Sequence, residues 1–209
     1  PVVDLNINPH NPIIGKKGRS VSPDPLEVIE YADMFIKIMN QYNVFCCLKH
    51  FPGHGSALTD THEIMTDVTD VWTEKELIPY SVLIREGFSQ GVMTCHIQNS
   101  KYDSVYPATL SKKMIEKLLI EKMGFQGIIF SDDMMMKAVS NHFSLEESIC
   151  LAINAGVDIL TFSNNSYYDP ELPKKVHSIL VELVLNRKIP YERIKISYDK
   201  IIKIKKNII

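Results

Sequence analysis

The stretch Val44-Phe45-Cys46-Cys47-Leu48-Lys49-His50-Phe51-Pro52-Gly53-His54-Gly55 decides the fold that we predict for this chain. Its first part, Val44–Leu48, is apolar without alternation, which is typical of a strand buried on both faces of a parallel sheet. From Lys49 onward, basic and imidazole side chains are mixed with glycine and proline, as in a loop. Parallel α/β proteins bind ligands where such strands end, so we expect the chemistry of this chain to begin at Lys49.

Apolar runs of similar length recur along the chain, and stretches with helical periodicity separate them. The predicted strands are Val2–Leu5, Val44–Leu48, Gly91–Cys95, Gly127–Phe130 and Val157–Phe162. Asp24 predicts the N-terminal cap of the first helix. The segments Thr73–Glu76 and Ser144–Glu147 predict capping boxes at two later helix starts. Strands that alternate with helices in this way predict an α/β fold with a parallel sheet.

A (β/α)8 barrel and an open doubly wound sheet both fit this alternation. Polar groups follow several of the strands: they are the loop 6–19, Lys49 and His50, His96 and Asp132. A barrel mouth gathers that many strand ends better than a single switch point does. A complete barrel has roughly 250 residues, whereas this chain has 209. We therefore predict an N-terminally incomplete TIM barrel of about five strand-helix units, with residues 1–209 as a single domain and about three units before them.

The composition limits the class of partner. The 209 residues are 45% hydrophobic and 23% charged, with a formal net charge of -2, so no general attraction draws the chain to nucleic acid or to an anionic membrane. No apolar run reaches the length of about 18 residues that spans a bilayer. The 4 cysteines lie in apolar surroundings without metal-site spacing, which predicts buried free thiols in a reducing compartment. We expect a cytoplasmic protein with a small-molecule partner, and any signal peptide would precede Pro1.

Two acids follow the strand Gly127–Phe130. Asp132 would place its carboxylate at the barrel mouth, while Asp133 points the opposite way and would cap the next helix. Side-chain alternation alone does not decide which of the two faces inward.

Asp60 and His62 lie two residues apart in a loop, close enough for the carboxylate to hold the orientation of the imidazole. An imidazole with a pKa of about 6.5 gives and takes protons near neutral pH. The pair predicts an acid/base dyad, and a surface histidine is the alternative interpretation.

A metal site is a further alternative, because the chain holds a plausible set of ligands: His50, His54, His62, His96 and Asp132. Proline and glycine between His50 and His54 exclude the helix that would align these two. A metal-dependent amidohydrolase barrel therefore stays as an alternative function, and a catalytically dead remnant of a barrel is another.

Three motifs follow one another along the chain: Lys49-His50-Phe51-Pro52-Gly53-His54-Gly55, Asp60-Thr61-His62 and Ile128-Ile129-Phe130-Ser131-Asp132-Asp133-Met134. In this order and spacing they resemble the β-N-acetylhexosaminidase branch of family 3 glycoside hydrolases. The segments Pro1–Leu5 and Ile14–Ser20 are similar to that family too, so the resemblance covers nearly the whole chain.

The resemblance implies a retaining, exo-acting hydrolase of terminal N-acetylglucosamine, with cell-wall muropeptides and peptidoglycan recycling as the expected context and no cofactor. Asp132 would be the nucleophile that forms a covalent glycosyl intermediate. His62 would act as general acid and then base, paired with Asp60.

The same resemblance implies that Arg19, Lys49 and His50 hold the hydroxyl groups of the sugar, with His96 near that subsite. The segment Lys16–Gly18 lengthens the loop before Arg19 relative to the family, which is a departure from the family pattern at this position. The oligomeric state is left open.

Overall fold

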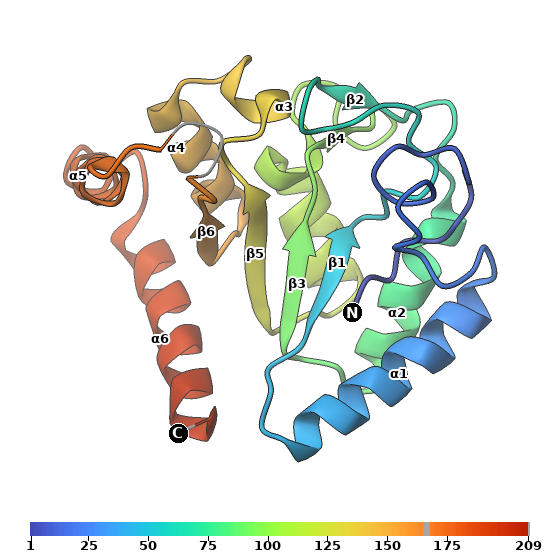
Figure 1. Ribbon diagram of the computed structural model, residues 1–209. Coiled ribbons are helices and arrows are strands. Elements are labelled where there is room, and N and C mark those ends of the chain that lie inside the picture. The colour runs from blue at the N-terminus through green and yellow to red at the C-terminus, as the bar shows by residue number, and fades with distance from the viewer. Residues whose placement is uncertain (165–167, 209) are drawn as a thin grey trace.

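The structure, a computed structural model, describes residues 1–164 and 168–208, and its centre is a curved parallel sheet (Figure 1). Its elements in chain order are α1 (Pro25–Gln41), β1 (Cys47–Phe51), β2 (Thr66–Asp67), η1 (Glu74–Leu77), α2 (Ile78–Arg85), β3 (Gly91–Thr94), β4 (Ile97–Gln98), η2 (Ala108–Leu110), η3 (Lys113–Lys122), β5 (Ile128–Asp133), α3 (Lys137–Ser140), α4 (Leu145–Ala155), β6 (Ile159–Thr161), α5 (Leu172–Leu185) and α6 (Tyr191–Ile208). Among these, η1 and η2 are short 3-10 helices, and η3 has π-type hydrogen bonding.

The order of the strands decides between the two predicted architectures. The main sheet runs β1-β3-β5-β6, all parallel and in chain order. Val2 pairs in parallel with Lys49, so the first predicted strand lies beside β1 as a single bridge. Each connection thus moves the chain one strand further in one direction, which builds a barrel and excludes the reversal of a doubly wound sheet. The predicted α/β fold with an incomplete TIM barrel is confirmed.

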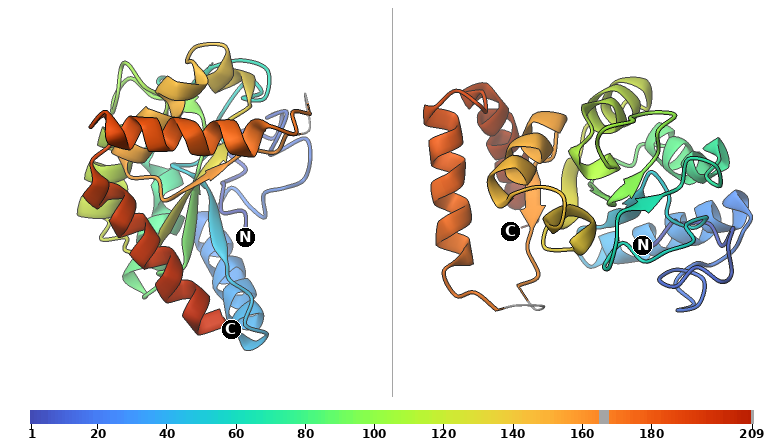
Figure 2. Two further views of the ribbon diagram at one scale, coloured as in Figure 1. Left: turned by 90° about the vertical axis from the view of Figure 1, so that its left-hand side faces the viewer. Right: turned by 90° about the horizontal axis from the view of Figure 1, so that it is seen from above.

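The helices follow the outer side of the curved sheet, as the view from above in Figure 2 shows. In Figure 1 the strands point upward, and the short pair β2 and β4 gathers with α3 at their carboxyl ends. Apolar faces join these layers: Val28 and Ala32 of α1 belong to the same buried cluster as Leu48 of β1. Among the described residues, no helix combines the length and apolar character that crossing a membrane requires.

The predicted ends of two strands, β1 and β5, were wrong by a few residues. Lys49 and His50 lie within β1, and Asp132 and Asp133 lie within β5, not in the loops after them. Main-chain pairing continues past the apolar residues because ladder hydrogen bonds do not depend on side-chain polarity. The polar side chains therefore start from the sheet, which holds their backbones more firmly than a loop would.

Two of the three predicted helix caps are confirmed. Asp24 accepts a hydrogen bond from the backbone N–H of Leu26, and the capping box Ser144–Glu147 is complete. The capping box predicted at Thr73–Glu76 was wrong, because Thr73 makes no side-chain cap. The Glu76 carboxylate turns inward and accepts hydrogen bonds from the Gly55 N–H (2.8 Å) and the Ser56 hydroxyl (2.5 Å).

Candidate active site

Asp4 is a buried carboxylate at the carboxyl end of the sheet, and the sequence did not lead us to select it. Its Oδ1 accepts the backbone N–H groups of His54 (2.8 Å) and His50 (3.2 Å), and its Oδ2 is 2.7 Å from Nδ1 of His50. Burial by itself would raise the pKa of Asp4, but the histidines outweigh it and hold the pKa below its ordinary value. An acid inside the apolar run Val2–Leu5 is the signal that could have found it, because buried carboxylates require partners.

His50 connects Asp4 with Arg19. The Nη2 group of Arg19 lies 3.2 Å from Nε2 of His50, and the Nη1 group donates to the carbonyl of Ile13 at 3.2 Å. Because an arginine side chain only donates, Nε2 of His50 must accept, and the ring proton then lies on Nδ1, facing Asp4. The structure therefore brings Arg19 and His50 together in spite of the longer loop before Arg19.

The loop after β1 packs unusually close to the first strand. A Cβ at Gly55 would lie 1.7 Å from the carbonyl oxygen of Leu5, so only glycine fits there. The side-chain amide of Asn11 donates to the carbonyl of His54 at 2.7 Å. The loop is thus held from both sides, and its histidines take up defined positions.

Asp60 and His62 form the predicted pair. Oδ1 of Asp60 accepts the backbone N–H of His62 (2.8 Å) and lies 2.7 Å from its Nδ1. The side chains are 30% and 54% exposed, so the pair lies at the surface of the mouth. Burial alone would raise the pKa of Asp60, but the hydrogen bonds and charge of His62 lower it below the ordinary value. With Nδ1 held by Asp60, Nε2 is the ring nitrogen that remains for proton transfer.

The structure separates the two acids that side-chain alternation left undecided. Asp133 accepts hydrogen bonds from the backbone N–H groups of Met135 (3.0 Å) and Ser163 (3.0 Å), so it ties together the loops that follow β5 and β6. Asp132 accepts the N–H of Asp133 at 2.8 Å. Asp132 is also close enough for its negative charge to act on the imidazoles of His54 and His96. The charge of Asp133 acts on His96 as well, so the two acids are distinguished by their hydrogen bonds: Asp133 holds the loops after β5 and β6.

His96 and Lys49 complete the predicted set. His96 is fully buried, and its Nε2 donates to the carbonyl of Asp133 at 2.9 Å. Burial lowers the pKa of His96, and the charge of Asp132 partly opposes this. Lys49 is half-buried in β1, where its backbone pairs with Val2 on one side and Met93 on the other.

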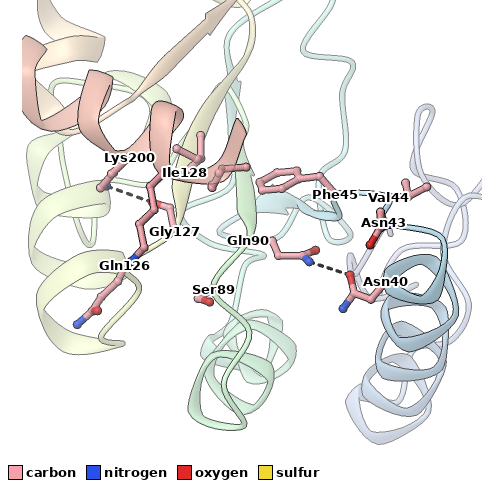
Figure 3. A pocket seen from close by; sticks show the side chains of 12 residues that line it. Asn40, Asn43, Val44, Phe45, Ser89, Gln90, Gln126, Gly127, Ile128 and Lys200 are labelled. Atoms are coloured by element: carbon pink, nitrogen blue, oxygen red, sulfur yellow. Dashed lines mark hydrogen bonds between the residues drawn. The ribbon is translucent and has the colours of Figure 1, made fainter. Parts of the chain in front are cut away.

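Cavities occur at both ends of the sheet. A cavity of about 990 Å³ at the carboxyl end is lined by His62, Glu63 and Asp133, together with apolar side chains that include Phe143 and Leu172. The second cavity, of about 490 Å³, lies at the amino end between Gln90 and Lys200 (Figure 3). None of the described residues that line this second cavity is a histidine or an acid. The carboxyl end is therefore the candidate active site. Across the described part of the chain, no group of three His, Cys, Asp or Glu side chains is placed to hold a metal ion.

A singly wound parallel sheet whose carboxyl end gathers carboxylates and imidazoles places the chain among TIM-barrel domains with a site at the barrel mouth. Residues 1–204 match the Glycosyl hydrolase family 3 N terminal domain, and the chain belongs to this family.

Named relatives agree with this assignment. The chain is 38% identical over 168 residues to a beta-hexosaminidase of Tolumonas auensis, a match that covers 79% of the chain and 49% of the relative. The solved structure of a family 3 beta-N-acetylglucosaminidase from a Paenibacillus species superposes with a TM-score of 0.90 at 30% identity, over 100% of this chain and 39% of that one. For the beta-N-acetylglucosaminidase from Thermotoga maritima the TM-score is 0.81 at 34% identity, over 98% and 42%. The chain thus spans about half the length of these relatives or less.

Proposed function

We propose that this chain carries the catalytic residues of a retaining, exo-acting β-N-acetylhexosaminidase that removes terminal N-acetylglucosamine from glycosides. The observation that carries the proposal is the Asp60–His62 pair at the same barrel mouth as Asp132. Relatives and solved structures named as beta-hexosaminidases and beta-N-acetylglucosaminidases support it.

In the proposed mechanism, a carboxylate oxygen of Asp132 attacks C1 of the sugar while Nε2–H of His62 gives its proton to the departing glycosidic oxygen. The C1–oxygen bond breaks, the aglycone leaves as an alcohol, and the sugar stays as an ester of Asp132. Asp60 accepts the Nδ1–H of His62, so it supports the cation whenever the imidazole is protonated.

In the second step neutral His62 takes a proton from water, and the resulting hydroxide oxygen attacks C1 from the face that the aglycone left. The Asp132 ester bond breaks, and both groups return to their first state. Two displacements at C1 retain the anomeric configuration. The imidazole thus replaces the second carboxyl group that most retaining glycosidases use.

We propose that Arg19, Lys49, His50 and His96 contact the sugar or hold the groups that do. The pair of Arg19 and His50 supports this, because Asp4 fixes the ring so that its nitrogen orients the guanidinium. Muropeptides are the proposed natural substrates, and the 4 free thiols support a reducing, cytoplasmic compartment.

The test uses the protein expressed from its intact reading frame and an aryl β-N-acetylglucosaminide. Asp132→Asn is expected to lower kcat about 10⁴-fold, because it removes the nucleophile. Asp133→Asn, the matched control, is expected to lower kcat about tenfold or less, because Asp133 orients loops and does not react.

The alternatives predict other results. Turnover that a chelator abolishes would support a metal-dependent amidohydrolase-like barrel, and no turnover by the unsubstituted protein would support a catalytically dead remnant. Full activity of Asp132→Asn would refute the proposed nucleophile.

A further inference from the structure

His54 is a buried histidine that the proposed mechanism does not use. Its backbone is held on both sides, since its N–H donates to Asp4 and its carbonyl accepts from Asn11. Burial lowers the pKa of its imidazole below the ordinary value, which leaves the ring neutral near neutral pH. A neutral buried imidazole has one donor and one acceptor nitrogen, and each requires a partner.

One ring nitrogen of His54 has its partner in the acid/base loop, residues 60–62, while Nδ1 has no hydrogen-bond partner among the described residues. Its Nε2 lies 3.2 Å from Oγ1 of Thr61, the residue between Asp60 and His62. Thr61 is only 1% exposed, whereas the side chains on either side of it reach the surface. Thr61 is therefore the point at which the otherwise exposed dyad is attached to the interior.

Besides the exposed ion pair of Glu63 with Lys137 (2.6 Å), main-chain contacts join this loop to α3. The N–H of Ala138 donates to the carbonyl of Thr61 at 3.4 Å, and that of Lys137 donates to the carbonyl of His62 at 3.3 Å. Both distances are longer than the usual 2.9–3.0 Å of such bonds, so these contacts are weak. The hydroxyl of Thr61 on His54 is thus the buried side-chain contact that fixes where the dyad stands.

Glu76 supports His54 from the opposite side. Its carboxylate accepts from the Gly55 N–H and the Ser56 hydroxyl, directly after His54 in the chain. A Cβ at Gly53 would lie 2.6 Å from Cβ of Glu76, so the segment 53–56 lies directly on this side chain. The position of His54 is therefore set by packing and hydrogen bonds that do not involve the dyad.

We propose that His54 is a positioning residue for the acid/base dyad and acts through its hydrogen bond to Thr61. The proposal rests on the proposed function and adds a residue pair to it. The imidazole of His62 must lie in line with the departing oxygen, and small displacements of a proton donor cost large factors in rate. His54 and Thr61 keep that donor in place without contacting the substrate.

The test compares Thr61→Val with Thr61→Ser in the protein expressed from its intact reading frame. Two aryl β-N-acetylglucosaminides serve as substrates, one with a phenol leaving group that needs protonation and one with a dinitrophenol leaving group that does not. For Thr61→Val we expect kcat/KM to fall about tenfold with the phenyl substrate and less than about twofold with the dinitrophenyl substrate. Thr61→Ser keeps the hydroxyl, so the ratio of its kcat/KM values for the two substrates is expected to equal that of the unsubstituted protein.

Thr109→Val is the matched control, because Thr109 is also buried, at 0% exposed, and donates its hydroxyl to the carbonyl of Cys95 at 2.9 Å. This variant is expected to change kcat/KM by the same factor for both substrates. Equal losses with both substrates for Thr61→Val would overturn the proposal, because they would mean that Thr61 matters only for folding. Failure of Thr61→Ser to restore the ratio would overturn it as well.

A second pair of variants tests His54 itself. The amide of a glutamine occupies nearly the position of Nε2 of histidine, whereas that of an asparagine occupies the position of Nδ1. His54→Gln is therefore expected to keep the substrate ratio within about threefold of the original, and His54→Asn to resemble Thr61→Val. The reverse order would contradict the proposal. Inactivity of the unsubstituted protein, or full activity of Asp132→Asn, would instead contradict the proposed function.

Discussion

Asp4 and Asp158 are two buried aspartates at opposite ends of the same sheet, and they hold different kinds of partner. Asp158 precedes β6 at the amino end. It accepts hydrogen bonds from Arg193 (2.6 Å), Ser197 (2.7 Å) and Lys200 (3.0 Å), which all lie on α6. Their spacing of four and three residues places them on one face of the helix. Asp158 therefore fixes α6 to the sheet.

The network around Asp158 ends within the fold. Lys200 also donates to the carbonyl of Gly127 at 3.1 Å, a contact drawn in Figure 3. Burial alone would raise the pKa of Asp158, but Lys200, Ser197 and Arg193 together lower it. All three donors lie on α6, and the groups that accept from them belong to the sheet and its connections. Asp158 therefore acts as a structural anchor.

The network around Asp4 continues outward. Asp4 binds the ring of His50 and the backbone N–H of His54. The ring of His50 contacts Arg19 and that of His54 contacts Thr61, both in loops of the barrel mouth. The two aspartates share burial and a lowered pKa, so neither property identifies a functional site. The difference lies in the partners. Asp158 binds side chains of α6 and the N–H of Ile129 in β5, whereas Asp4 binds two histidine residues whose rings contact loops at the carboxyl end.

The largest effect is expected from Asp158→Ala. It leaves two cations of α6 without their buried partner, so the free energy of unfolding should fall by about 3–5 kcal/mol. Urea denaturation at neutral pH measures this. Activity per folded molecule should not change. Asp33→Ala, which breaks an exposed pair with Lys37, is the control and should cost less than about 1 kcal/mol. If activity falls by more than the loss of folded protein explains, Asp158 also affects the active site, and the amino end of the sheet is not purely structural.

Glu76 provides the next test, because burial raises its pKa from 4.5 to about 7. The folded state then keeps a proton that the unfolded state releases, so the free energy of unfolding falls as pH rises from 4.5 to about 7. The fall amounts to about 3 kcal/mol. Denaturation curves between pH 5 and pH 8 should show this slope, and Glu76→Gln should lack it. Asp158 has the opposite sign, since its lowered pKa contributes stability that is lost as pH falls through the folded pKa. An identical slope in Glu76→Gln would contradict the assignment.

Asp4→Asn tests the carboxyl end. An amide accepts at only one of its two atoms, so either the ring or the backbone N–H groups lose their acceptor, and His50 no longer holds Arg19 in place. We expect kcat/KM for an aryl β-N-acetylglucosaminide to fall about 100-fold. Circular dichroism corrects for the folded fraction. Asp24→Asn is the control, because asparagine still caps α1. A variant with unchanged kcat/KM would show that Asp4 is only a second structural anchor.

The smallest effect is expected at the rim of the mouth. Lys137 and Glu63 form an ion pair of 2.6 Å with both side chains largely exposed. Lys137→Met should change the free energy of unfolding by less than about 1 kcal/mol, and the change should shrink further in 1 M salt. Thermal unfolding at low and high salt measures it. A larger, salt-insensitive effect would mean that the acid/base loop depends on this pair more than on Thr61.

Sequence patterns predicted the fold because the features that they report, burial of apolar runs and local capping, depend on residues close together in the chain. Apolar runs must be buried, and buried strands of one direction require helical crossovers, so the α/β class followed from patterning alone. The capping box at Ser144 was predicted because all its groups lie within four residues. The one at Thr73 was wrong because Glu76 has a distant partner in Gly55. The residues that the sequence predicted for the site lie at the carboxyl end of the sheet. Their catalytic roles stay predictions.

The sequence by itself determined that parallel strands alternate with helices and that polar groups follow the strands, because the hydrophobic period and the local turn residues are written along the chain. Only the tertiary structure decided that Asp4 orders the histidines, that Asp133 holds the loops after β5 and β6, and that Thr61 attaches the dyad to His54. These contacts join residues from separate loops and strands. Packing of the whole fold determines which of these residues meet, and a local sequence pattern does not contain that information.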